Sequence, residues 1–167
     1  MLHKILALIV CFYILAAIQA SFLPHFSIIG VTPNLVLIGV FLVAFFEKSS
    51  SYSGIFGALS AGMSLDLLGN SFIGSSVIVY LAIYFLLKEV LKQLPDMPRK
   101  YYLMYFLPIL AVSVIFCDFL LGVFYYFNHK EIFLNFIGVG ILVKIIYTVL
   151  IGAAGFYIFN ALQQKKK

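Results

Sequence analysis

The sequence predicts an all-α integral membrane protein whose single domain, residues 1–167, is a compact bundle of six transmembrane helices. Its residues are 64% hydrophobic and 10% charged, whereas a soluble domain usually carries about 25% charged residues. Too few charged groups are present to cover a surface that faces water, so lipid is the natural solvent for the exterior. The apolar runs approach the ~20 residues that a helix needs to cross a bilayer. None shows the alternating polarity, over about ten residues, that is typical of a transmembrane β-strand.

The six predicted spans cover residues 5–20, 34–46, 52–68, 72–91, 101–127 and 132–162. The first begins after His3 and Lys4, so an alternative is a signal peptide that is cleaved after Ala20. Ile18 is larger than the small residue usually found near such a cut, which favours an uncleaved first helix. Either interpretation places Ser21 outside the membrane and leaves the remaining topology unchanged.

The connection over residues 21–33 contains Pro24 and Gly30 but no lysine or arginine. We therefore expect it on the external side, lying partly in the membrane interface. Pro33 suits the first turn of a helix, where its missing N–H is not needed. The second span is short for a full crossing, so we expect either a start at Asn34 or an earlier start with a kink at Pro33.

The later spans are separated by residues that disfavour a continuous helix. The third span ends at Gly69, which is followed by Asn70 and Ser71. The fourth is followed by a polar connector over residues 92–100, and residues 128–131 form the turn between the fifth and sixth spans.

Basic residues lie almost entirely on one side of this predicted topology. Lysine and arginine in short loops mark the cytoplasmic side of a membrane protein. Only Lys130 lies outside, whereas the inside holds Lys4, Lys48, Lys88, Lys92, Arg99, Lys100, Lys165, Lys166 and Lys167. Both termini are therefore predicted to be cytoplasmic. Because these residues lie at the ends of apolar runs rather than across a folded surface, we predict no nucleic-acid partner.

The third span contains a stripe of small residues that ends in an acid. Gly54, Ala58, Gly62 and Asp66 recur every four residues, a spacing that lets two helix backbones approach closely within a membrane. One interpretation is a packing face in which Asp66 makes a capping or interhelical hydrogen bond. The other is a surface where a ligand or partner docks.

Two further charged residues lie within spans. From their distances to the turn at residues 128–131, Asp118 and Lys144 lie roughly 15 and 20 Å from the external ends of their helices. A charge at the bilayer centre costs about 2.5–3.5 kcal/mol on insertion scales. We therefore predict that Lys144 pairs inside the bundle with Asp118 or with Asp66. The pair could be structural, or it could handle a substrate or protons.

Two polar stripes at helical spacing accompany these charges. They consist of Gly140, Lys144, Thr148 and Gly152 in the sixth span, and of Ser76, Tyr80, Tyr84 and Lys88 in the fourth. Buried tyrosines usually find a hydrogen-bond partner. The stripes could be ordinary packing faces, or Tyr80 and Tyr84 could line a polar cavity.

The sequence carries no recognisable catalytic motif, and we predict a protein that is not an enzyme and takes no cofactor or metal. His3, His25 and His129 lie at three separate span ends, so no Ser–His–Asp or Cys–His set can be assembled. No HExxH helix, Walker loop or Gly-rich dinucleotide turn is present. Cys11 and Cys117 lie in apolar runs without CxxC spacing, which disfavours a disulfide framework or a zinc site.

A set of residues in the second to fourth spans carries a family resemblance. Pro33 and Asn34 open the second helix, and the set continues with Gly57, Gly62, the Leu65-Asp66-Leu67 step, Gly69 and Gly74. In order and spacing these residues resemble the bacterial rod shape-determining protein MreD family. The total length, the six spans, the two cytoplasmic ends and Asp118 in the fifth span also fit. The resemblance covers most of the chain, although its specific part is only about forty residues long.

The resemblance implies a non-enzymatic component of the cell-elongation machinery in the bacterial inner membrane. It implies a fold similar to the substrate-binding subunits of energy-coupling-factor transporters. The implied partners are MreC, with MreB, RodA and its transpeptidase as further members of the complex. On this interpretation, the stripe of Gly54, Ala58 and Gly62 would receive the single membrane helix of MreC, with Asp66 near its external end.

An alternative function is a transporter subunit that captures a small molecule. Ala16 and Ala20 form one pair of small residues of the kind such subunits use against their energising partner. A polar cavity lined by Tyr80 and Tyr84 would favour this alternative.

Overall fold

The computed structural model describes residues 2–46, 52–69, 73–93, 102–129 and 139–164, and the regular secondary structure of these ranges is helical. Their six α-helices are α1 (Leu2–Ala17), α2 (Leu35–Phe46), α3 (Ser53–Leu68), α4 (Ser75–Gln93), α5 (Tyr102–His129) and α6 (Val139–Gln164). Within these ranges the structure has no named strand, and an isolated β-bridge joins Ile28 to Val31. The predicted all-α class is therefore confirmed.

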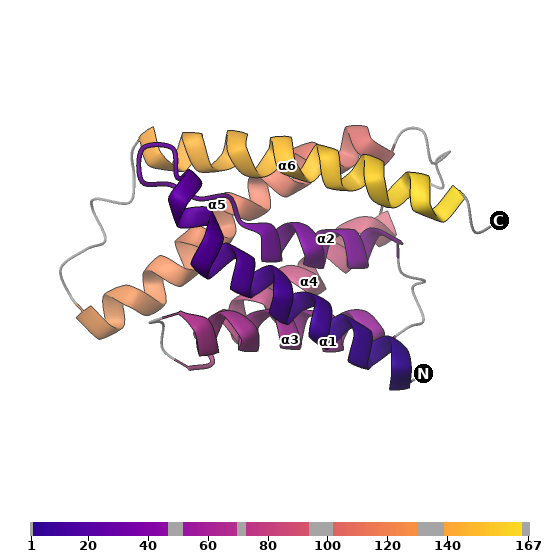
Figure 1. Cartoon of the computed structure of the whole chain (residues 1–167), viewed down its shortest axis with the longest axis horizontal. Helices are drawn as coiled ribbons and strands as arrows, with labels where there is room; N and C mark the ends of the chain where they lie inside the picture. Colours follow the sequence, from indigo (N-terminus) through magenta and orange to yellow (C-terminus); the bar gives the residue numbers. More distant parts are fainter. Residues whose placement is uncertain (1, 47–51, 70–72, 94–101, 130–138, 165–167) are drawn as a thin grey trace.

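The six helices run alternately between the two ends of the bundle, as Figure 1 shows. Helices α1, α3 and α5 begin at the end that carries both chain termini, and α2, α4 and α6 end there. The starts of α2, α4 and α6 lie toward the opposite end.

Three helices are long and apolar enough to cross a membrane. They are the continuous helical segment His3–Phe26 and the segments Tyr102–Phe124 and Gly140–Ala161. Helices α2 and α3 are shorter apolar helices. Large apolar side chains such as Val10, Val112 and Leu150 point outward from the bundle. Length, composition and this apolar exterior indicate a membrane protein.

The first helical segment is longer than the predicted span at residues 5–20. Beyond α1 the chain continues through a π-helical turn, Ile18–Phe22, and a 3-10 turn, Leu23–Phe26. Residues 18–26, most of which were expected in an irregular external connection, are therefore helical. Pro24 is tolerated because it lies at the start of the 3-10 turn, where a helix does not need its N–H.

Helix α2 is the central element of the bundle and contacts all five other α-helices. Six of its 12 residues are buried: Val36, Leu37, Ile38, Val40, Phe41 and Ala44. The helix begins at Leu35, so the expectation of an earlier start with a kink at Pro33 is wrong. At 1.5 Å per residue its 12 residues cover about 18 Å, which is little more than half of a ~30 Å hydrocarbon core.

Glycines allow α1 and α4 to pack closely on α2 and α3. The ring of Phe12 in α1 lies between Gly39 and Gly57, where added Cβ atoms would be 2.9 and 3.2 Å from its ring carbons. Helices α3 and α4 approach most closely at Gly62, where a Cβ atom would be 2.4 Å from the backbone Cα of Val77. These contacts place the main chain of one helix directly against its neighbour.

The stripe of small residues in α3 is therefore occupied within the chain. Gly54, Ala58, Gly62 and Asp66 are all buried, and α3 packs against α1, α2 and α4. The packing interpretation describes this stripe correctly. The expectation that it forms a lateral surface for a partner helix is wrong, because its residues are already covered.

The remaining boundaries follow the local backbone. Gly69 ends α3 and donates its N–H to the Leu65 carbonyl at 2.8 Å. Gly74 has a φ of +99°, a conformation open mainly to glycine, so α4 begins at Ser75 rather than at residue 72. The first part of the predicted sixth span, residues 132–138, lies outside the described residues, as do Lys48, Arg99, Lys100, Lys130 and residues 165–167.

Candidate functional site: a polar cluster at the start of helix α2

Asn34 is the residue that begins the central helix. Its side-chain Oδ1 accepts a hydrogen bond from the Leu37 backbone N–H at 3.0 Å, which is the usual arrangement of an N-cap residue. The neighbouring Val36 N–H donates to Oε1 of Gln19 at 3.0 Å. Two N–H groups that a helix start leaves unpaired are thus satisfied inside the bundle.

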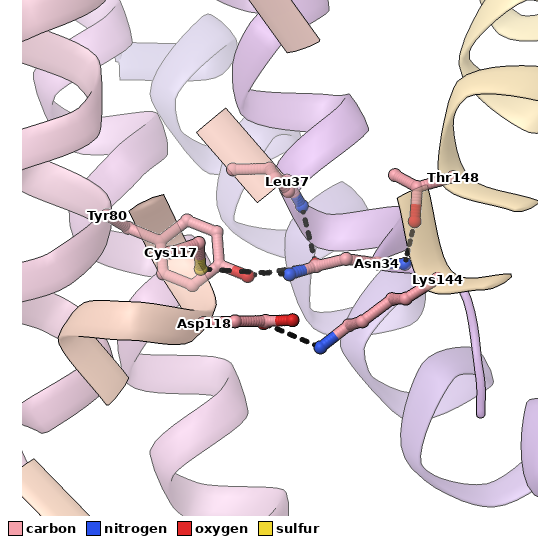
Figure 2. Close-up of polar contacts among 7 residues, drawn as sticks. All are labelled: Asn34, Leu37, Tyr80, Cys117, Asp118, Lys144 and Thr148. Atoms are coloured by element: carbon pink, nitrogen blue, oxygen red, sulfur yellow. Dashed lines mark hydrogen bonds and ion pairs between the residues drawn. The ribbon is translucent and has the colours of Figure 1, made fainter. Parts of the chain in front are cut away.

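The same asparagine connects α2 to three other helices, as Figure 2 shows. The hydroxyl of Tyr80 in α4 donates to Asn34 Oδ1 at 2.9 Å. The Asn34 backbone N–H donates to Thr148 Oγ1 in α6 at 3.1 Å. Its side-chain amide lies 3.9 Å from Cys117 Sγ in α5. All four residues are buried, so Asn34 is the hub of a polar cluster that holds α2, α4, α5 and α6 together.

An ion pair lies beside this hub. The Lys144 ammonium of α6 is 2.6 Å from Asp118 Oδ1 of α5, and the two side chains extend toward each other next to Asn34 in Figure 2. The side chain of Asp118 is 5% exposed and that of Lys144 is 23% exposed. Of the two partners predicted for Lys144, this one is present in the structure. Pairing offsets part of the cost of placing either charge in an apolar interior.

Asp118 keeps one oxygen outside this pair. Its Oδ2 atom is buried and has no hydrogen-bond partner within the described part of the chain. A buried carboxylate oxygen without a partner costs free energy, about 1–3 kcal/mol or more for a charged group. The contact with Lys144 is therefore the main compensation for burying this carboxylate.

Asp66, in the last turn of α3, accepts hydrogen bonds from the backbone. Its Oδ2 accepts the Gly74 N–H at 2.7 Å, and its Oδ1 accepts the Ser76 N–H at 3.1 Å. A carboxylate that accepts N–H bonds at a helix start also interacts favourably with the helix dipole. Asp66 thus fixes the turn from α3 into α4, as the capping interpretation predicted.

The two polar stripes predicted from sequence both face inward. In α4, Tyr80 and Tyr84 are buried, and Lys88 Nζ donates to the Ala44 carbonyl at 3.1 Å. This bond caps the C-terminal end of α2, where a cation is favourable. The ammonium also lies 5.8 Å from the Tyr84 ring centroid. Tyr84 and Lys88 therefore belong to the packing of α4 on α2 rather than to the Asn34 cluster.

The stripe of α6 packs on α2, on α5 and on the connection that precedes α2. Gly140 lies close to Val31, and a Cβ atom at Gly152 would be 2.5 Å from a methyl group of Leu110 in α5. Between these glycines, Lys144 and Thr148 reach the cluster. The small residues of this stripe bring α6 near enough for its two polar side chains to make their contacts.

The side chains of the cluster hold the helices in position, and their arrangement in the described residues does not indicate a particular reaction. No group of three or more His, Cys, Asp or Glu side chains that could hold a metal occurs in the described ranges. The groups closest to Asn34 are already hydrogen-bonded to it. Sequence reasoning found both polar stripes and the ion pair but missed Asn34 as their connection. The available signal was an asparagine directly before an apolar run, which is a typical N-cap pattern.

Comparison of the chain with protein-family models, curated proteins and solved structures found no match.

Proposed function

We propose that the chain crosses the bacterial inner membrane six times and is a non-enzymatic, MreD-like subunit of the cell-elongation complex. In this role it binds MreC and helps to control peptidoglycan synthesis and cell shape. MreB, RodA and its transpeptidase are further members of the proposed complex.

The alternating direction of the helices supports six crossings with both termini in the cytoplasm. Lys4 at the start of α1 and Lys88 and Lys92 near the end of α4 belong to helix ends at the same end of the bundle (Figure 1). Basic residues mark the cytoplasmic side. Helix α2 is short, but residues 31–34 before it can add up to ~13 Å of chain, enough to complete a ~30 Å crossing.

The observation that best supports the proposal is that the residues on which the resemblance to the MreD family rests have structural roles in the bundle. Asn34 joins four helices, Gly57 and Gly62 permit close helix contacts, and Asp66 and Gly74 shape the turn into α4. Each of these residues organises the bundle through packing or hydrogen bonds. Such a use suits a scaffold that presents fixed outer faces to other membrane proteins.

The proposed partner helix needs an outer face, because the small stripe of α3 is buried. Site-specific photo-crosslinkers at Val10, Val112 and Leu150 would sample exposed positions on α1, α5 and α6. We expect one of the three to form a crosslink with MreC in native membranes and the other two to label lipid. Depletion of the chain should convert rod-shaped cells into rounded ones.

Two results would contradict this proposal. One is the recovery of no elongation-complex protein from any of the three crosslinker positions while the tagged chain is abundant in the membrane. The other is the persistence of rod shape after the chain has been depleted.

The alternative, a small-molecule-binding transporter subunit, is favoured by one observation. Helix α2 begins inside the bundle, and the polar groups of Asn34, Tyr80, Asp118 and Lys144 gather at that start. Transporters often build their sites from helices that begin near the membrane midplane. Mass spectrometry of compounds released from the purified chain tests this function, because a stoichiometric small molecule would support it over the scaffold.

A further inference from the structure

A tight hairpin with an apolar surface connects the first helical segment to α2. We call residues 22–31 the outer hairpin. The chain reverses through two backbone hydrogen bonds, Ile28 N–H to the Val31 carbonyl at 3.1 Å and Val31 N–H to the Ile28 carbonyl at 3.0 Å. Between them, Ile29 and Gly30 have positive φ values of 56° and 73°. The residues from 5 to 46 include no Lys, Arg, Asp or Glu.

The outer hairpin exposes four large apolar side chains, together with the polar side chains of His25 and Ser27. Phe22, Phe26, Ile28 and Ile29 are 58%, 57%, 50% and 74% exposed. Ile29 combines the greatest exposure of the four with a backbone conformation that is unfavourable for a β-branched residue. Strain of this kind persists only where the surrounding structure imposes the conformation, and it is concentrated at functional sites. A turn that faced water could use glycine or asparagine at this position without the strain.

The outer hairpin is held in place by α6. The hydroxyl of Tyr147 lies 3.4 Å from the Phe26 carbonyl oxygen. At the other limb, Val31 lies close to Gly140, where a Cβ atom would be 3.5 Å from its methyl group. The hairpin lies at the end of the bundle away from the termini (Figure 1). Contacts with α6 at both limbs therefore hold the apolar tip of the hairpin at this end of the bundle.

The exposed residues continue an apolar stripe of the first helical segment. Exposed side chains recur every four residues from α1 into the hairpin, at Leu6, Val10, Ile14, Ile18, Phe22 and Phe26. The segment that contains this stripe, His3–Phe26, is long and apolar enough to cross a membrane. The face of the outer hairpin is thus continuous with a face that meets lipid.

We propose that the outer hairpin inserts into the boundary between the headgroups and acyl chains of the membrane leaflet at this end of the bundle. Phospholipid is the occupant of its exposed face. The phenylalanines lie at the level where the span ends, and Ile28 and Ile29 extend the contact sideways into the interface. Burial of apolar side chains at this depth is the interaction that holds amphipathic segments at membrane surfaces. The contact anchors the start of α2 at a fixed depth.

The absence of tryptophan from the chain allows a sharp test. The Ile29→Trp variant carries the sole tryptophan and is reconstituted into phosphatidylcholine vesicles. Its emission should be shifted to shorter wavelength than that of Gln93→Trp, a control at an exposed position at the end of α4. Bromine atoms near the carbonyl end of the acyl chains should remove most of the Ile29→Trp fluorescence. Bromine atoms deeper in the chain should quench Leu150→Trp more strongly.

Two outcomes would overturn the proposal. Emission at the wavelength of the Gln93→Trp control, with ready quenching by aqueous acrylamide, would place the tip in water. Short-wavelength emission that brominated lipid does not quench would mean that protein, either a partner or a second copy, covers it. If Ile29→Trp does not fold, Phe26→Trp probes the same hairpin with an aromatic replacement and is judged by the same criteria.

Discussion

The ion pair between α5 and α6 should show a favourable coupling energy, so that removing both members costs less stability than the sum of the two single removals. Lys144→Met leaves the Asp118 carboxylate, 5% exposed, without its partner. Loss of one partner from a buried pair typically costs about 3–5 kcal/mol. Asp118→Asn leaves a lysine that is 23% exposed and whose long stem can move its charge toward water. We expect Asp118→Asn to cost less, about 1–3 kcal/mol.

The double variant Asp118→Asn/Lys144→Met contains no unpaired charge. Contacting residues commonly show coupling energies of about 0.5–3 kcal/mol. We therefore expect the double variant to be about 2 kcal/mol more stable than the sum of the two single losses predicts. For a chain of this size, a loss of 3 kcal/mol lowers the melting temperature by roughly 6–12 °C.

Thermal unfolding can be followed through the reactivity of the Cys117 thiol. It is buried, whereas Cys11 is exposed, so a Cys11→Ser background leaves one thiol that a reactive dye reaches only after unfolding. Melting curves in detergent are recorded with this dye and with far-ultraviolet circular dichroism, and the two midpoints should agree. Equal melting temperatures for Lys144→Met and the parent, or a double variant that loses the full sum, would refute the reasoning.

Two further substitutions test the packing and the hub by circular-dichroism melting. Gly62→Ala places a methyl group 2.4 Å from the Val77 Cα and should cost about 1–3 kcal/mol or more. The matched control Gly155→Ala meets only ordinary contacts at 3.6 Å and should be neutral or stabilising, so equal losses would contradict the close approach of α3 and α4. Asn34→Ala removes the acceptor of the Leu37 N–H and the Tyr80 hydroxyl and should cost about 2–4 kcal/mol. Asn34→Ser keeps a short cap oxygen and should recover part of that loss, and equal stability of the two variants would exclude capping by the side chain.

Helix positions were predictable because apolar run length and breaker residues act locally. The predicted third span differs from α3 by one residue at its start, and the predicted second span begins at Asn34, the residue before α2. The first span was predicted too short, because Pro24 suggested an irregular connection. In the structure that proline begins a 3-10 turn and is compatible with a helical segment that continues to Phe26.

The ion pair was predictable for a different reason. Two opposite charges at similar depth in an apolar medium have few other ways to lower their free energy. Asn34 as a hub was not predictable, because its partners Tyr80 and Thr148 lie 46 and 114 residues away. Their meeting depends on how the helices are arranged around α2. The burial of the α3 stripe depends on the same arrangement, since the spacing of small residues does not say which helix they meet.

The position of Asn34 also bears on how the chain is made. The Thr148 hydroxyl that accepts its N–H is synthesised 114 residues later, roughly 6–23 s at ordinary rates of translation. With six crossings as proposed, polar groups at the start of α2 lack their partners until then, inside a membrane where unpaired backbone groups cost several kcal/mol each. In that topology, newly made α2 needs shelter in the insertion machinery until the last helix arrives. A nascent chain cut short before α6 keeps this defect, which gives membrane quality control a means to recognise it.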